Sequence, residues 1–154
     1  MRQFGRTTKT CCSINQWWIE TKVYWVSTNG YDTHNSQVSL GNTTSGGHSG
    51  TLTELSNAIK DFMDDIKAKG LEERVLGLAF SEFGRTIKSN GNLGTDHGVA
   101  GPMFLFGKHI NPGIFGINPL IPAPGTINPV VSMQYDYRLV YQSILQSWFC
   151  ILKK

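Results

Sequence analysis

The stretch that decides the predicted fold runs from residue 23 to residue 80. It opens with V-Y-W-V-S-T at residues 23–28, a run of β-branched and aromatic residues that Asn29 and Gly30 end. It closes with V-L-G-L-A-F at residues 75–80, a second and wholly apolar run. Runs of this length and composition, bounded by turn residues, predict buried β-strands.

A helix is predicted between these two strands. The sequence T-L-T-E at residues 51–54 fits a capping box, in which the threonine hydroxyl and the glutamate carboxylate satisfy the first backbone amides. Apolar residues follow at helical spacing, and Gly70 is suited to end the helix. Because strand, helix and strand in this order favour parallel pairing through a right-handed crossover, we predict an α/β fold with a partial, mostly parallel sheet and flanking helices.

The rest of the chain adds a third apolar strand, M-F-L-F at residues 103–106, and a C-terminal helix that Asp136 is suited to cap. Residues 107–135 contain five of the six prolines, which forbid a continuous helix, so short edge strands and turns are expected there. Residues 1–22 lack a clear period and are predicted to be a poorly ordered lead-in. The folded domain is therefore expected over residues 23–150.

Composition and charge narrow the class of protein. Charged residues make up 16% of the 154 residues, and the net charge is +3 with no basic stripe, which argues against a nucleic-acid partner. No run of 18 apolar residues is present, so no membrane span is predicted. The first 22 residues lack the apolar core of a secretory signal, and three cysteines form neither a disulfide framework nor a metal-binding spacing.

Three short motifs contain the residues suited to chemistry. They are G-Y-D-T-H at residues 30–34, S-E-F-G-R-T at 81–86 and G-T-D-H-G at 94–98. The first two follow predicted strands, where an open α/β sheet binds its ligands, and the third lies in a glycine-rich loop able to reach the same edge. Carboxylates and imidazoles together suit zinc, manganese or iron. The candidate metal ligands are Asp32, His34, Glu82, Asp96 and His97.

Each candidate also has a simpler interpretation. An aspartate after a strand commonly caps a turn, and Glu82 has Arg85 three residues away as a partner for an ion pair. No serine, threonine or cysteine stands in a recognisable nucleophile motif, and no phosphate-binding glycine loop is present. The residues therefore predict a metal site more clearly than they predict a reaction.

These motifs, in this order, resemble the domain-of-unknown-function 1501 family. The resemblance rests on G-Y-D-T-H-N-S-Q, V-L-G-L-A-F-S-E-F-G-R-T, N-G-N-L-G-T-D-H-G, P-M-F-L-F-G and D-Y-R-L-V-Y-Q-S-I-L-Q-S-W-F, and it covers about residues 20–150. Members of the family are described as sulfatase-like proteins of the alkaline phosphatase superfamily. The resemblance implies that residues 23–150 form the C-terminal part of an alkaline-phosphatase-like fold. It also implies a divalent metal (zinc, manganese, calcium or magnesium) and a sulfate or phosphate ester as substrate.

The resemblance also implies roles for individual residues. Asp32 and His34 match the family's Asp-Thr-His position, Glu82 stands where superfamily relatives have an aspartate, and His97 matches a final metal-binding histidine. Phe83 replaces the histidine that follows that aspartate, which departs from a two-metal pattern. In the superfamily, the nucleophile and the first metal ligand lie upstream of this region, so the chain resembles a C-terminal fragment. Family relatives are often exported, although the chain itself shows no signal.

Two functions are carried forward from the sequence. The first is the metal-binding C-terminal fragment of a sulfatase- or phosphatase-like hydrolase, inactive alone. Its partner would be a missing N-terminal half or a second copy of the chain, because a truncated domain would expose apolar surface. The alternative is a non-catalytic binding or assembly module with a structural metal site.

Overall fold

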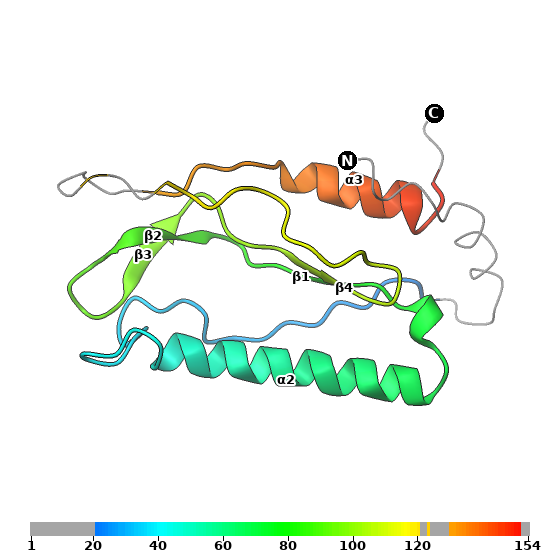
Figure 1. Ribbon diagram of the computed structural model, residues 1–154, viewed down its shortest axis with the longest axis horizontal. Coiled ribbons are helices and arrows are strands. Elements are labelled where there is room, and N and C mark those ends of the chain that lie inside the picture. Colours follow the sequence, from blue (N-terminus) through cyan, green and yellow to red (C-terminus); the bar gives the residue numbers. More distant parts are fainter. Residues whose placement is uncertain (1–20, 121–122, 124–129, 152–154) are drawn as a thin grey trace. The chain divides into compact units, whose positions relative to one another are not determined.

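The computed structural model describes residues 21–120, 123 and 130–151 of the chain. Its elements are two α-helices, one short 3-10 helix and four short strands (Figure 1). The chain divides into two compact units. One unit, residues 27–110 with 117–133, contains one long helix and all four strands. The predicted lead-in over residues 1–22 lies outside the described residues, apart from its last two positions.

The long helix α2 spans Gly47–Ala68 and begins four residues before the predicted capping box. That capping box is wrong, because Thr51 lies inside the helix and its hydroxyl donates to the His48 carbonyl at 3.0 Å. Inside an α-helix the Glu54 N–H donates to the backbone carbonyl four residues earlier, so it needs no capping hydroxyl. The predicted apolar stripe is confirmed in part: Leu55, Ile59, Met63 and Ile66 are partly buried along α2. Leu52 and Phe62, which belong to the same predicted stripe, are exposed (41% and 46%).

The predicted helix stop at Gly70 is confirmed. Gly70 has a φ of 66°, a left-handed conformation that glycine adopts without a steric penalty. Its N–H donates to the Lys67 carbonyl at 2.9 Å, and the Leu71 N–H donates to the Ile66 carbonyl at 3.0 Å. This pair of bonds is the Schellman motif, which satisfies the last carbonyls of a helix.

The four strands form two antiparallel pairs. β1 (Gly77–Ala79) pairs with β4 (Phe104–Phe106), with Leu78 opposite Leu105. β2 (Gly84–Ser89) pairs with β3 (Thr95–Gly98), and this hairpin lies between β1 and β4 in the chain. β1 therefore leads into β2 and β3 returns into β4, and the two pairs form two separate two-stranded sheets (Figure 1).

The predicted parallel sheet is wrong, and with it the α/β class and the alkaline-phosphatase-like fold. The runs at 75–80 and 103–106 do form strands, but they pair antiparallel. Parallel pairing needs a crossover, usually a helix, between the two strands. The segment between these two strands instead folds as the β2–β3 hairpin, which reverses the chain direction and returns it beside β1.

The predicted strand at residues 23–28 is also wrong. The structure assigns no strand to residues 21–33, and four consecutive apolar side chains are largely exposed: Val23 (67%), Tyr24 (71%), Trp25 (75%) and Val26 (89%). An apolar run forms a β-strand only where a neighbouring strand pairs with its backbone N–H and C=O groups. Within the part of the chain that the structure describes, this run has no place in either sheet.

The second unit contains helix α3, which spans Tyr137–Ser147. The predicted cap is confirmed, because the Asp136 carboxylate accepts from the Arg138 N–H at 2.9 Å. Between β4 and α3, the described residues contain no helix, and the isolated bridge of Val130 to Thr86 is their one ladder contact. The described part of residues 107–135 therefore agrees with the prediction of turns and short edge strands.

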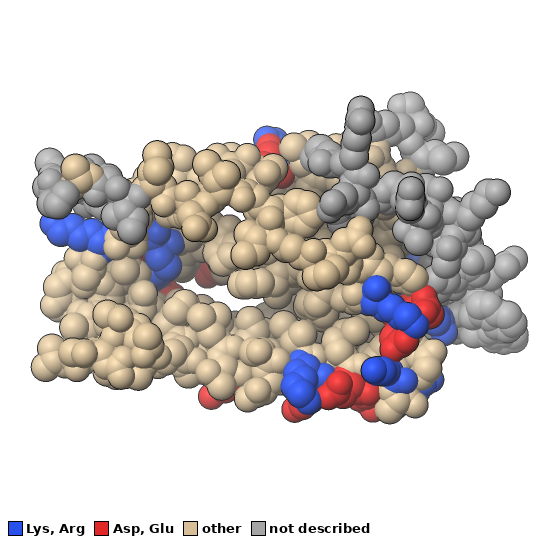
Figure 2. Space-filling view, in the orientation of Figure 1, with Lys and Arg blue, Asp and Glu red and all other residues tan. Residues whose placement is uncertain are grey.

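Charges are mixed on the face that Figure 2 shows, where basic and acidic side chains gather over the C-terminal half of α2. Lys60 and Asp64 pair at 2.7 Å along α2. Beyond α2, Lys108 follows β4 and contacts Glu73 of η1 (Glu72–Arg74) at 2.5 Å. No helix within the described residues is long and apolar enough to cross a membrane.

Candidate metal centre

Two segments far apart in the sequence supply the candidate ligands. Asp32 and His34 lie in the loop that precedes α2, and His97 lies on β3. Backbone hydrogen bonds hold the loop against the β2–β3 turn: the Ser36 and Val38 N–H groups donate to the carbonyls of Asn92 and Leu93, each at 3.1 Å. The loop therefore lies beside the turn along several residues.

A glycine allows the close approach of these two segments. Gly94 is buried immediately before β3, and a Cβ atom placed on it would lie 2.3 Å from the carbonyl carbon of His34. No side chain fits at that distance, so a residue other than glycine would push the loop away from the hairpin. The glycine in G-T-D-H-G thus brings the backbone of His34 next to the strand that bears His97.

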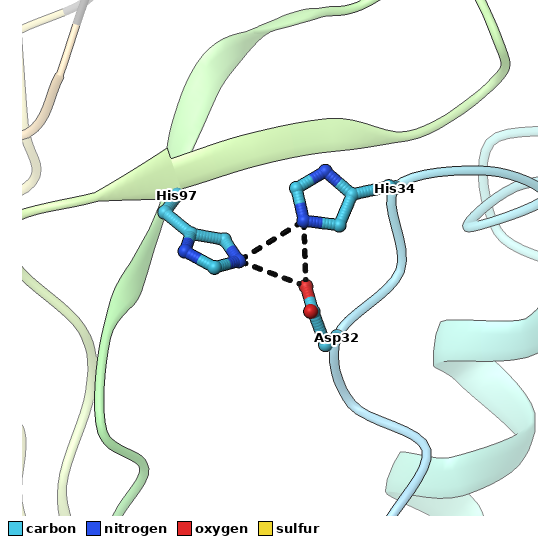
Figure 3. Close-up of side chains that lie close together, drawn as sticks. All are labelled: Asp32, His34 and His97. Atoms are coloured by element: carbon cyan, nitrogen blue, oxygen red, sulfur yellow. Dashed lines mark hydrogen bonds and ion pairs between the residues drawn. The ribbon is translucent and has the colours of Figure 1, made fainter.

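The three side chains converge on one point (Figure 3). The Asp32 Oδ1 atom lies 3.1 Å from the Nε2 atoms of both His34 and His97. The two Nε2 atoms lie 3.0 Å apart. Three electron-rich atoms in a nearly equilateral triangle repel each other unless a proton or a cation lies between them.

The spacing of the triangle suits a divalent metal ion. An octahedral ion with ligand distances of about 2.1 Å places neighbouring ligand atoms about 3.0 Å apart, and a tetrahedral ion places them about 3.4 Å apart. The observed separations of 3.0–3.1 Å lie close to the octahedral spacing. Two imidazoles and one carboxylate on one face are a donor set that zinc and iron use.

Arg85 lowers the pKa of the Asp32 carboxyl in this cluster. Its Nη1 donates to Asp32 Oδ1 at 2.6 Å. This hydrogen bond lowers the pKa of the Asp32 carboxyl below its usual value, and the hydrogen bond from His97 and the charges of both histidines lower it further, against the raising effect of partial burial. Asp32 is therefore ionised at neutral pH, as a metal ligand must be.

Asp96 approaches His34 from the opposite side of its ring. The Asp96 Oδ1 atom lies 3.3 Å from His34 Nδ1, and Asn90 Nδ2 donates both to that oxygen at 3.3 Å and to the His34 carbonyl at 2.7 Å. A carboxylate on Nδ1 favours the tautomer whose Nε2 lone pair is free. In this arrangement Nε2 of His34 is directed toward Asp32 and His97.

Phe83 supports the other histidine. Its ring stacks on the His97 ring with centroids 3.7 Å apart and planes 16° from parallel. Phe83 is therefore a packing partner of one predicted ligand. The Arg85 guanidinium also lies 5.8 Å from the Phe83 ring centroid.

The structure brings together three of the five predicted ligands. Asp32, His34 and His97 form the cluster, and Asp96 lies behind His34. Glu82 is exposed just before β2 and is not a member of the cluster. Arg85, which the sequence paired with Glu82, instead contacts Asp32.

Sequence reasoning missed the residues that support the cluster. Gln37, Asn90 and Thr95 are uncharged and carry no metal-binding motif, so no local signal distinguishes them. Thr95 is the buried polar residue of the described chain, 9% exposed. The position of Thr95 directly before Asp96 and His97 is the one sequence signal that could have identified it.

A search of the curated proteins and a search of the solved structures find no match to the chain. A family model, described as "Protein of unknown function (DUF1501)", matches residues 9–121, which is more than half of the chain and includes all three residues of the cluster. The chain belongs to the DUF1501 family.

Proposed function

We propose that this chain binds a divalent metal ion through Asp32, His34 and His97, as the metal-binding part of a sulfatase- or phosphatase-like ester hydrolase. The observation that carries the proposal is the triangle of ligand atoms, with sides of 3.0–3.1 Å. The support is the donor set and its spacing, and not the fold, since the expected parallel sheet is absent from the described residues.

The exposure of the cluster favours an open site over a closed one. The three side chains are each 46–49% exposed, so one side of the triangle faces solvent. Structural zinc sites are closed by four protein ligands, whereas catalytic sites keep a position for water or substrate. An ion held by three ligands at this surface has such a position, where it would polarise an ester oxygen.

The hydroxyl groups beside the cluster do not act as nucleophiles. Thr33 Oγ1 donates to Gln37 Oε1 at 3.0 Å, and Thr95 Oγ1 donates to the same oxygen at 2.7 Å. A nucleophilic hydroxyl must instead donate to a base such as histidine or a carboxylate. We therefore propose that the chain alone binds metal without hydrolysing sulfate or phosphate esters.

Metal analysis and calorimetric titration of the purified chain with Zn²⁺ and Mn²⁺ test this proposal. We expect one ion per chain, a rise in melting temperature on adding it, and loss of both in Asp32→Ala. Asp61→Ala, an exposed aspartate of α2, is the matched control and should bind as the wild type does. Absence of binding by the wild-type chain would contradict the proposal.

Hydrolysis assays with aryl sulfates and aryl phosphates test the proposal that the chain alone is inactive. No metal-dependent turnover is expected from the chain alone, and turnover that Asp32→Ala abolishes would show that the nucleophile is within these residues. Hydrolysis gained on adding the N-terminal part of a family member would support the hydrolase. Metal binding with no activity in that mixture would favour the alternative, a binding or assembly module.

A further inference from the structure

The geometry of the cluster depends on how one loop is held against one hairpin. Asp32 and His97 are 65 residues apart, and Asp32 lies in a loop without regular secondary structure. Such a loop keeps a carboxylate in place only if its side chains are tied to a more ordered element. The residues that provide this tie are Arg85 of β2, Thr95 of β3 and Gln37 of the loop itself.

These residues form a closed ring of hydrogen bonds. Arg85 Nη1 donates to Asp32 at 2.6 Å, and Arg85 Nε donates to Thr95 Oγ1 at 2.9 Å. Thr95 Oγ1 donates to Gln37 Oε1 at 2.7 Å, and the same oxygen accepts from the Thr33 hydroxyl at 3.0 Å. Since Thr33 follows Asp32 in the chain, the ring closes through one peptide bond.

The hydrogen-bond donors and acceptors in the ring are consistent. The Thr95 hydroxyl accepts once and donates once, and Gln37 Oε1 accepts from two hydroxyls. The middle of the ring is shielded, because Thr95 is 9% exposed and the Arg85 side chain is 17% exposed, whereas Asp32 at its outer end is 49% exposed. Hydrogen bonds in shielded positions hold geometry better than exposed ones, where water competes.

We propose that Thr95 and Gln37 are positioning residues of the metal site, which hold Asp32 at its distance from His97 through Arg85 and Thr33. This inference rests on the proposed metal binding. Neither residue contacts the point where the three ligand atoms converge, so each acts on the ion through Asp32. Outer partners of this kind typically contribute about 10- to 100-fold to metal affinity.

The hydrogen bonds of the ring indicate that Arg85 positions the Asp32 carboxylate and does not bind a substrate. All three guanidinium nitrogens have partners: Nε and Nη1 as above, and Nη2 on the Thr95 carbonyl. An arginine that binds a sulfate or phosphate group must direct its fork toward the ligand. Here the fork is directed toward Thr95 and Asp32, which favours a role in holding the carboxylate.

Titration with Co²⁺ tests the inference, because its visible absorption depends on the geometry of the ligands as well as on occupancy. Thr95→Val removes the hydroxyl at nearly constant volume, and Thr95→Ser keeps it. We expect about 10- to 100-fold weaker binding and an altered absorption spectrum in Thr95→Val, with wild-type behaviour in Thr95→Ser. Thr53→Val, in an exposed position of α2, is the matched control.

Gln37→Leu is a second variant, and it decides the question if Thr95→Val does not fold. It should weaken Co²⁺ binding in the same direction, because both threonine hydroxyls lose their acceptor. Wild-type affinity and spectrum in the folded variants would overturn the positioning role and leave the proposed metal binding intact. Failure of the wild-type chain itself to bind Co²⁺, Zn²⁺ or Mn²⁺ would overturn both.

Discussion

The two antiparallel strand pairs differ in what holds them together. β1 and β4 place G-L-A opposite F-L-F, so apolar contacts accompany the ladder between them. β2 and β3 contain polar residues at most positions, and Arg85 faces His97 across the pair. The polar pair is held by side-chain hydrogen bonds to a distant loop, and it contains the candidate site. The candidate site therefore lies in the strand pair that hydrogen bonds, and not apolar contacts, hold to its neighbours.

Removing a ligand from the polar pair gives the largest expected effect. His97→Ala should reduce metal affinity by more than the 10- to 100-fold typical of outer partners, because a direct ligand is lost. Leu105→Ala in β4 should leave affinity unchanged and lower the free energy of unfolding by about 1–2 kcal/mol, less than for a fully buried leucine. Calorimetric titration and chemical denaturation measure the two quantities, and an equal loss of affinity in both variants would erase the distinction.

A substitution at the contact between the loop and the β2–β3 hairpin should lower both the metal affinity and the free energy of unfolding. Gly94→Ala places a Cβ atom 2.3 Å from the His34 carbonyl carbon, so the loop must move. We expect a destabilisation of about 1–3 kcal/mol, as for overpacked sites, together with weaker metal binding.

Gly50→Ala is the matched control for this substitution. Gly50 lies in α2 with nothing within 4 Å of a Cβ atom, so alanine should stabilise the chain by about 0.5–1 kcal/mol. Thermal unfolding with and without Zn²⁺ measures both variants. A neutral Gly94→Ala would contradict the close approach of His34.

The stacking of Phe83 on His97 should contribute to metal affinity, whereas Phe106 in β4 should contribute to stability alone. Phe83→Leu keeps an apolar side chain but loses a ring contact worth about 0.5–1.5 kcal/mol, and metal affinity should fall by a corresponding few-fold. Phe106→Leu in β4 should alter stability without altering affinity. Reduced affinity in Phe106→Leu but not in Phe83→Leu would reverse the assignment of roles.

The smallest expected effect is the pH dependence of the metal-free chain. The Asp32 pKa is lowered chiefly by Arg85, so ionised Asp32 stabilises the fold above its unfolded pKa of about 4, and that contribution disappears as the pH falls through the lower folded pKa. Arg85→Gln should therefore lower the melting temperature at pH 7, and the difference from wild type should shrink below about pH 4.

Lys108→Met tests the same pH dependence of the melting temperature next to the apolar pair of β1 and β4. The hydrogen bond from Lys108 chiefly lowers the pKa of Glu73, so the sign is the same and the difference should again shrink on acidification. Metal affinity should not change, because these residues are not members of the cluster. A difference in melting temperature that stays constant from pH 7 to pH 3 would contradict the electrostatic origin in either variant.

The sequence alone predicts those structural features that depend on residues close together in the chain. The apolar stripe and glycine stop of α2, the aspartate cap of α3 and the strands near residues 77 and 104 follow from periodicity, capping and apolar runs. Three residues of the cluster were also predicted, because Asp-Thr-His and Asp-His unite metal-binding groups within short motifs.

The pairing of strands and the surroundings of the site depend instead on contacts between residues far apart in the sequence. An apolar run does not specify its partner. V-Y-W-V-S-T therefore predicts a strand that the structure does not contain, and the strands that pair antiparallel as β1 and β4 are predicted to belong to a mostly parallel sheet. The hairpin was missed because its strands lack an apolar period. Gln37 and Thr95 became part of the site through hydrogen bonds spanning 58 residues, and local sequence contains no record of contacts made only when the chain folds.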